Sequence, residues 1–173
     1  TVLQEVGYGA RFFPNMPDLP VIVGLLIAVA ITALFGMING MVIAWLKVPP
    51  FIATLGMQTI VYGICQIYTG NDPQGGLKVS YKAVANGSLF GVIPYLFLFA
   101  LVVGVFMWLL YNKTRHGKYM YAIGGNENAA AVAGVNVPAT LIRIYTLAGA
   151  LYGLAGFLLG AKAGGASTAT GFG

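Results

Sequence analysis

The sequence predicts an all-α fold, a polytopic bundle of about four transmembrane helices joined by polar connections. Hydrophobic residues make up 58% of the 173-residue chain and charged residues only 8%, whereas soluble domains carry roughly 25% charged residues because their surface is solvated. The uncharged stretches are also long enough to cross a hydrocarbon core of about 30 Å as helices. We therefore expect a lipid bilayer, rather than water, to surround the chain.

The first predicted span is residues 21–46, which contain no charged residue. A helix of this length would be about 39 Å long and could cross the bilayer with a tilt. Lys47, Pro49 and Pro50 follow it. A lysine is expected at the water boundary, and prolines lack the backbone N–H that a continuing helix needs. The sequence therefore predicts a very short connection and then a second span over residues 51–69.

The third and fourth predicted spans are residues 92–111 and 144–161. The third has aromatic residues near both ends, where amphipathic rings favour the headgroup level. Residues 70–91, between the second and third spans, are rich in glycine and asparagine, so we expect a water-exposed loop there. Residues 112–143 form the second polar connection.

The ends of the sequence predict a fragment. The first twenty residues contain no basic start followed by an apolar segment, so they are not a signal peptide. The chain also stops directly after a hydrophobic segment. We therefore expect residues 1–173 to be part of one transmembrane domain of a longer chain.

The basic residues predict the orientation, because cationic loops are retained on the cytoplasmic side. One side would carry five basic residues and one acid, a net +4, and the other four basic residues and three acids, a net +1. These groups are Lys47, Lys113, Arg115, Lys118, Arg143 and Glu127, against Arg11, Lys78, Lys82, Lys162, Glu5, Asp18 and Asp72. The 112–143 connection is therefore predicted to be cytoplasmic. Orientation also explains the net charge of +5 without a nucleic-acid partner.

Glycine spacing predicts close helix packing in the fourth span. Successive steps of four, three and four residues place four glycines on one stripe, and a similar pair occurs in the first span: Gly149, Gly153, Gly156 and Gly160, with Gly36 and Gly40. Small residues allow the dense contact that holds helices together in lipid, where apolar burial gives little drive for association. A surface that slides during transport is the alternative.

Polar side chains inside the first two spans are candidates for a substrate path, because an amide in hydrocarbon must find a partner. They are Asn39, Gln58, Thr59, Tyr62 and Gln66. Hydrogen bonding between helices is the alternative role. The four predicted spans contain no Asp, Glu, Lys or Arg, whereas ion-coupled carriers commonly use buried ionisable groups. A path of this kind suits an uncharged solute.

Residues 126–134 predict a short capped helix. Asn126 can serve as the N-cap, Glu127 complements the positive end of the helix dipole, and Gly134 can adopt the left-handed conformation that ends a helix. Pro138 then suits the first turn of the fourth span. So short a helix is unstable in isolation, so we expect it to dock against another surface.

Other chemistries find little support in the sequence. The diglycine at 124–125 is not part of a phosphate-binding loop, because no G-x-x-x-x-G-K-[ST] pattern occurs. Cys65 is the only cysteine and His116 the only histidine, so neither a disulfide nor a metal site is predicted. Glu127, His116 and Ser167 show no spacing that identifies an enzyme's catalytic group.

Four stretches carry a resemblance to a known family. They are Asn39-Gly40, residues 50–56 (PFIATLG), residues 112–118 (NKTRHGK) and residues 122–136 (AIGGNENAAAVAGVN). In these the chain resembles the permease subunits of bacterial monosaccharide ABC importers, the galactose/methyl-galactoside type first and ribose permeases more distantly. The cytoplasmic loop of that family carries an E-A-A-x-x-x-G signature that docks on an ATPase. Here the signature falls on Asn128, Ala129, Ala130 and Gly134, with Asn128 in place of Glu and an acid one position earlier.

The resemblance implies a multi-pass transport subunit of the bacterial inner membrane that has no cofactor and is not an enzyme. Its implied partners are an ABC ATPase, a periplasmic sugar-binding protein, a second permease copy in a homodimer, and the monosaccharide. The residues implied in ATPase coupling are Asn126, Glu127, Asn128, Ala129, Ala130 and Gly134. The alternative is an ATP-independent carrier or channel for a small neutral solute.

Overall fold

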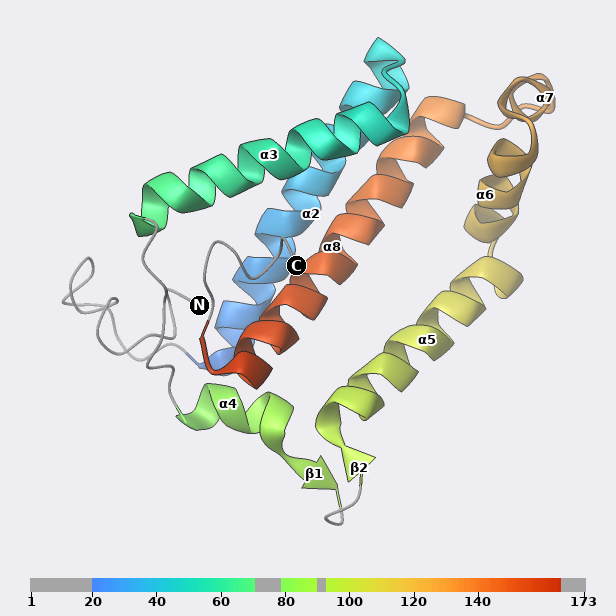
Figure 1. The fold of residues 1–173 in the computed structure, drawn as a ribbon. Helices are drawn as coiled ribbons and strands as arrows, with labels where there is room; N and C mark the ends of the chain where they lie inside the picture. The colour runs from blue at the N-terminus through green and yellow to red at the C-terminus, as the bar shows by residue number, and fades with distance from the viewer. Residues whose placement is uncertain (1–19, 71–78, 90–92, 166–173) are drawn as a thin grey trace.

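The computed structural model describes residues 20–70, 79–89 and 93–165. Its four long helices are α2 (Val21–Leu46), α3 (Pro50–Thr69), α5 (Tyr95–Lys113) and α8 (Val137–Ala163) (Figure 1). Each is long and apolar enough to cross a membrane. The predicted all-α bundle with four spans is therefore confirmed.

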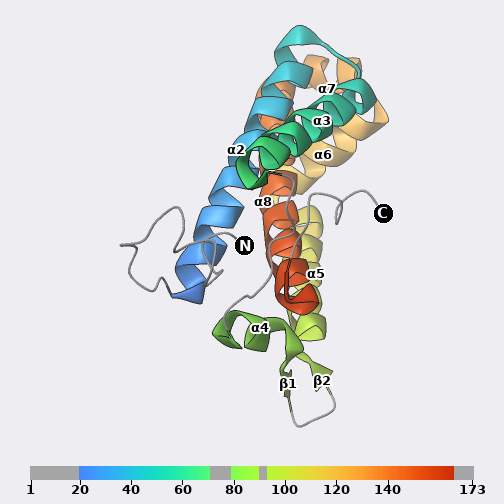
Figure 2. The ribbon, with the colours of Figure 1, turned by 60° about the vertical axis from the view of Figure 1, so that its left-hand side comes forward.

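The long helices α2 and α8 form the centre of the molecule. They lie side by side in both views and make the most extensive contact between elements (Figures 1 and 2). They are antiparallel, because Gly36 of α2 meets Gly149 of α8 while Gly40 meets Ile142. Helix α3 leaves one end of this pair at an angle, contacts chiefly α2 and buries none of its residues. Helix α5 lies on the other side of α8 (Figure 1).

Two helix starts differ from the prediction by three or more residues. Helix α5 begins at Tyr95 rather than at residue 92, because Pro94, with ψ at 140°, is an extended residue that serves as the N-cap. Helix α8 begins seven residues before the predicted 144. Its start is fixed by the Asn136 cap and by Pro138, whereas Arg143 is an exposed side chain that leaves the helical backbone intact. The start of the apolar stretch at residue 144 is therefore not the start of α8.

The water-exposed loop predicted over 70–91 differs from the structure where the structure describes it, because two of its residues, Tyr81 and Ala85, are buried. A short helix, α4 (Val79–Asn86), lies there and is followed by strands β1 (Ser88–Leu89) and β2 (Ile93–Pro94). The strands pair antiparallel, with Leu89 opposite Ile93. Residues 71–78 and 90–91 of this segment lie outside the described residues.

Helix α4 forms because two of its side chains, four positions apart, are buried on one face. Tyr81 and Ala85 pack with Phe157 and Ala161, which are also four apart on α8. Residues at this spacing share one side of a helix, so the two faces match. Val21 and Leu25 of α2, Ala28 of the same helix, and Leu96 of α5 pack around this cluster. Helix α4 therefore ties together one end of α2, one end of α8 and the start of α5.

The predicted 112–143 connection is also largely helical. Helix α6 (Arg115–Gly125) and helix α7 (Glu127–Val132) lie between α5 and α8, at the end opposite α4 (Figure 1). Thr114 caps α6 by accepting a hydrogen bond from the Gly117 N–H at 3.2 Å. A Cβ at Gly117 would lie 2.6 Å from the Leu110 carbonyl oxygen, so only glycine allows this turn. Gly117 therefore lets α6 begin in close contact with the last turn of α5.

Candidate functional site

Helix α7 begins with the cap that the sequence predicts. The Asn126 Oδ1 accepts a hydrogen bond from the Ala129 N–H at 3.0 Å. The Asn126 N–H in turn donates to the Ala122 carbonyl, which ends α6. Glu127 stands in the first turn of α7, where a carboxylate complements the positive end of the helix dipole. One asparagine therefore ends α6 and starts α7.

Helix α7 ends in a Schellman motif around Gly134. The Val135 N–H donates to the Ala130 carbonyl and the Gly134 N–H to the Ala131 carbonyl, each at 3.0 Å. This pair of bonds satisfies carbonyls that a helix end leaves open. It requires a left-handed residue at Gly134, whose φ is +85°. The predicted helix and its left-handed stop are confirmed, while a coupling role for them stays a prediction.

The surface of α7 is almost entirely exposed. Asn126, Glu127, Asn128 and Ala129 are exposed, and Ala130 is buried. Val132 is 90% exposed, although burying a valine side chain is worth about 1.5 kcal/mol or more. A six-residue helix with small and apolar exposed side chains is suited to docking against a further protein surface. The structure thus brings the predicted coupling residues together on one short, projecting helix.

Four of the six glycines proposed for helix packing, Gly36, Gly40, Gly149 and Gly153, lie in the contact between α2 and α8. A Cβ added at Gly36 would lie 3.0 Å from the Gly149 Cα, and one at Gly40 would lie 2.9 Å from the Ile142 Cα. A Cβ at Gly153 would lie 3.0 Å from the Val29 Cα. Such distances are shorter than ordinary carbon contacts, so these glycines allow the two backbones to touch.

The remaining two glycines of the predicted stripe differ from this pattern. A Cβ at Gly160 would meet the Tyr81 hydroxyl oxygen at 2.9 Å, so this glycine faces α4 rather than α2. A Cβ at Gly156 would meet no atom within 4 Å. The contact with α2 follows Gly149, Gly153 and Phe157, in steps of four. Positions four residues apart turn gradually around a helix, so the row of residues that contacts α2 does not include Gly156.

The predicted substrate-path residues fall into two groups. Asn39 is buried in α2, in the stretch that includes Gly40 and Ile43, and its Oδ1 has no hydrogen-bond partner. The other four lie on α3, which has no buried residue. On α3 the Gln66 Nε2 donates to the Tyr62 hydroxyl at 3.1 Å. Gln58 is exposed, and Thr59 donates to the Leu55 carbonyl within the helix. Their role in a substrate path stays a prediction.

The charged residues that the structure describes separate toward two ends. Lys47 caps the end of α2, Lys113 ends α5, and Glu127 starts α7. Lys82 of α4 and Lys162 in the last turn of α8 belong to the other end. This separation agrees with the sides that the charge count assigned to these residues. Which end faces the cytoplasm stays a prediction. Arg11, Lys78, Glu5, Asp18 and Asp72 lie outside the described residues.

Sequence reasoning missed three residues that position the helices. The Tyr81 hydroxyl donates to the Phe157 carbonyl at 2.7 Å, and the Asn86 Nδ2 donates to the Ala161 carbonyl at 3.4 Å. Asn136 caps α8 by accepting from the Ala139 N–H at 3.1 Å. Asn136 precedes Pro138 by two positions, a spacing that signals a helix start. Within the described ranges, no three His, Cys, Asp or Glu residues are grouped to hold a metal ion.

Comparison with known proteins identifies relatives. Residues 4–173 match the family model described as branched-chain amino acid transport system, permease component. The chain is 42% identical over 178 residues to the galactose/methyl galactoside import permease of Escherichia coli K12, covering 99% of this chain and 53% of that protein. It is 39% identical to the fructose import permease of Rhizobium meliloti, over 90% of this chain and 44% of that protein.

A third relative agrees with these two. The chain is 40% identical to the ribose import permease of Bacillus subtilis, over 70% of this chain and 38% of that protein. The chain thus spans about half the length, or less, of the curated relatives it matches. No solved structure matches it. Because the family model covers nearly all of the sequence, the chain belongs to the permease components of the branched-chain amino acid transport system family.

Proposed function

We propose that this chain is part of the membrane permease of an ATP-driven monosaccharide importer in the bacterial inner membrane. The observation that carries the proposal is the exposed, capped helix α7, in a chain 42% identical to a galactose/methyl galactoside import permease. The permease would move the sugar without chemical change. Its two end states would be selected by nucleotide binding to a separate ATPase.

Helix α7 is the proposed contact with that ATPase. It has an exposed polar start at Asn126, Glu127 and Asn128, and an exposed apolar end at Val132. The Asn126 cap and the Gly134 turn pair backbone groups at its two ends, so it can dock as a preformed unit. Helix α7 also connects α6 directly to α8. A displacement of α7 would therefore reach the central α2–α8 pair through a short, structured path.

A sugar is the proposed solute, although the family is described by branched-chain amino acids. The three relatives above are named for galactose, fructose and ribose, and galactose or its methyl glycoside is proposed on the highest of the three identities. An amino acid carries two charges that need charged partners in a membrane. In the four described spans, the Lys and Arg residues are Lys113, Arg143 and Lys162, none of them mid-helix, and Asp and Glu do not occur. Amide and hydroxyl groups such as those of Gln58, Tyr62 and Gln66 suit sugar hydroxyls.

The proposed assembly includes a periplasmic sugar-binding protein, an ABC ATPase and a second permease copy. In this arrangement the α7 end faces the cytoplasm and the α4 end the periplasm, following the excess of basic residues at the α7 end. The alternative is a carrier or channel that works without an ATPase. The import permeases found as relatives and the docking shape of α7 favour the ATP-driven system.

The test is uptake by the complete permease reconstituted in vesicles with its ATPase and binding protein. We expect galactose uptake that requires ATP and the binding protein, that excess methyl galactoside inhibits, and that excess leucine leaves unchanged. Uptake that proceeds without ATP would contradict the proposal and support the carrier or channel. Inhibition by leucine but not by sugars would retain the importer and refute the proposed solute.

A further inference from the structure

The end of α5 nearest α7 is joined to α6 through a single residue. Thr114 lies between Lys113, the last residue of α5, and Arg115, the first residue of α6. Its hydroxyl donates to the Leu110 carbonyl of α5 at 2.6 Å and accepts from the Gly117 N–H of α6 at 3.2 Å. One side chain is therefore hydrogen-bonded to both helices.

Two further contacts hold α6 against α5. A Cβ at Gly117 would lie 2.6 Å from the Leu110 carbonyl oxygen, so α6 starts against the backbone of α5. The rings of Tyr111 on α5 and Tyr121 on α6 meet edge to face, with centroids 5.9 Å apart. Gly117 and Tyr121 are four residues apart and share one side of α6. This side of α6 faces the last turn of α5.

The joint between α6 and α7 is equally short. Asn126 is the single residue between them. Its N–H donates to the Ala122 carbonyl of α6, and its Oδ1 accepts from the Ala129 N–H of α7, each at 3.0 Å. The last turn of α5, α6 and α7 are therefore linked without a flexible segment, as a path for mechanical coupling requires.

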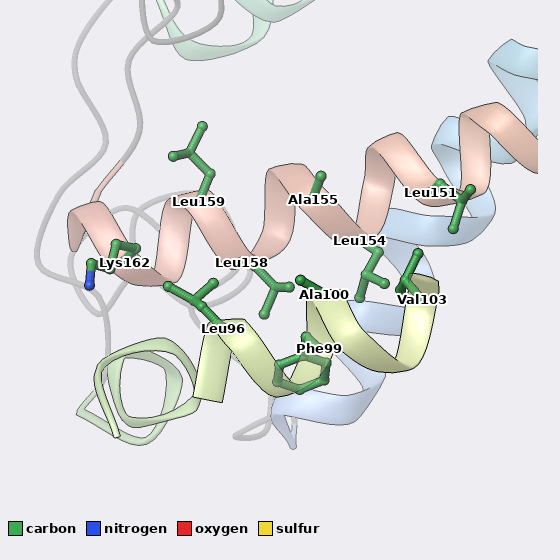
Figure 3. A pocket seen from close by; sticks show the side chains of 10 residues that line it. All are labelled: Leu96, Phe99, Ala100, Val103, Leu151, Leu154, Ala155, Leu158, Leu159 and Lys162. Atoms are coloured by element: carbon green, nitrogen blue, oxygen red, sulfur yellow. The ribbon is translucent and has the colours of Figure 1, made fainter. Parts of the chain in front are cut away.

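Away from this end, α5 has little direct contact with α8. A gap of about 360 Å³ lies between the two helices, and its apolar lining includes Phe99 and Val103 of α5 and Leu151 and Leu154 of α8 (Figure 3). Within the described residues, α5 is held chiefly at its two ends, by α4 and β2 at one end and by α6 at the other. A displacement of α8 by itself would therefore not carry α5 along, whereas a displacement of α6 would.

We infer that α5 receives the motion of α7 in addition to α8, and that Thr114, Gly117 and Tyr121 are the positioning residues that transmit it through α6. The inference rests on the proposed docking of an ATPase on α7. It adds to that proposal the span that moves with α7 and the contacts that link the two. A shift of the α7 end of α5 relative to α8 would change the width of the gap between them.

The first test uses the complete permease in vesicles with its ATPase and binding protein, and measures sugar uptake per ATP hydrolysed. Tyr121→Ala removes the ring contact with Tyr111 but leaves the Asn126 cap and the surface of α7 unchanged. We expect the ATPase to copurify as it does with the unmodified permease. Uptake per ATP should fall roughly fivefold, the equilibrium factor for losing one aromatic pair. Tyr121→Phe is the matched control, because it retains the ring and should retain the normal ratio.

Gly117→Ala tests the same path at the start of α6. The added Cβ would force α6 away from the backbone of α5, so we expect retained ATPase binding and reduced uptake per ATP. An unchanged ratio in both Tyr121→Ala and Gly117→Ala would overturn the inference. Loss of ATPase binding in Tyr121→Ala would also overturn it, because the ring contact would then shape the docking surface rather than transmit its motion.

A crosslink provides the reverse test. Tyr111→Cys and Tyr121→Cys are combined in a Cys65→Ala background, and a bifunctional maleimide joins the two cysteines before the ATPase is added. Without the crosslink we expect the low ratio of Tyr121→Ala, and with it a return to the ratio of the Cys65→Ala protein. A crosslinked permease that stays uncoupled would show that α5 and α6 must separate during transport, and would refute the inference.

Failure of the proposed function has a different result. If the ATPase does not copurify with the unmodified permease, or if uptake by that permease does not require ATP, the coupling role of α7 is refuted and the inference with it. Normal coupling in the unmodified permease, together with an unchanged ratio in the variants, would refute only the path through α6 to α5.

Discussion

The hydroxyl of Tyr81 donates a hydrogen bond to the carbonyl oxygen of Phe157 at 2.7 Å, and the two rings meet edge to face with centroids 4.7 Å apart. The residues are 76 positions apart in the chain. This pair anchors α4 on α8, and the apolar cluster around it includes residues of α2 and α5. Helix α4 is therefore a structural element that holds three spans at one end.

Removing the Tyr81 hydroxyl should weaken this anchor. Tyr81→Phe retains the ring but loses the hydrogen bond, so we expect a loss of about 0.5–1.5 kcal/mol of stability. Tyr81→Ala also removes the buried ring, and the expected loss rises to about 3–5 kcal/mol. Thermal unfolding of the purified protein in detergent measures both. A Tyr81→Ala variant as stable as the unmodified protein would show that α4 is not anchored there.

Alkaline pH should reduce the difference in stability between the unmodified protein and Tyr81→Phe. Burial raises the pKa of Tyr81 from 10.0 to about 12. A raised pKa in the folded state means that the neutral hydroxyl stabilises the fold below pH 10, and that this contribution is lost as the pH rises from 10 to 12. The difference in unfolding temperature between the two proteins should shrink over this range. A constant difference from pH 8 to pH 12 would contradict it.

Gly153 and Gly156 offer a matched pair on α8. A Cβ at Gly153 would lie 3.0 Å from the Val29 Cα, whereas one at Gly156 meets no atom within 4 Å. We expect Gly153→Ala to cost about 1–3 kcal/mol through overpacking. Gly156→Ala should be neutral or should stabilise the helix by up to about 1 kcal/mol. Unfolding in detergent gives both free-energy changes. Equal effects of the two substitutions would show that Gly153 does not lie in the α2–α8 contact.

Cysteine labelling tests the proposed orientation. Single cysteines replace two exposed alanines, Ala83 on α4 and Ala122 on α6, in a Cys65→Ala background. A membrane-impermeant maleimide applied from outside, after the outer membrane is permeabilised, should label Ala83→Cys. It should label Ala122→Cys only after the inner membrane is opened. The reverse pattern would invert the topology and place α7 outside the cell.

The long spans and the α7 caps could be predicted because their signals are local. The uncharged stretch predicted both ends of α2 correctly, because Lys47 and two prolines follow its last residue. Asn126 and Gly134 act on their own backbone neighbours within a few residues. Such features depend on few distant contacts, so the sequence alone contains them.

The features that could not be predicted depend on distant partners. Helix α4 lies between glycine- and asparagine-rich segments, and it forms through contacts of Tyr81 and Ala85 with α8, far along the chain. Similarly, the crossing of α2 and α8 decides which glycines are in contact, so that Gly153 packs and Gly156 does not. The start of α8 is a different case, because its signal, the Asn136 cap before Pro138, is local, and a boundary set by hydropathy alone missed it.

The central claim is that α7 transmits ATPase motion to the permease, and Gly134 tests it most directly. Gly134 has φ at +85° and no atom within 4 Å of a Cβ position, so a substitution there acts through backbone strain. Gly134→Val should strain the left-handed turn by about 1 kcal/mol or more and distort the end of α7. Gly134→Asn, which tolerates this conformation, is the matched control.

The measurement is copurification of the ATPase with the complete permease, together with sugar uptake, at equal amounts of permease in the membrane. We expect Gly134→Val to insert normally but to lose both ATPase binding and uptake, and Gly134→Asn to retain most of each. Normal ATPase binding and normal uptake in Gly134→Val would contradict the coupling role of α7.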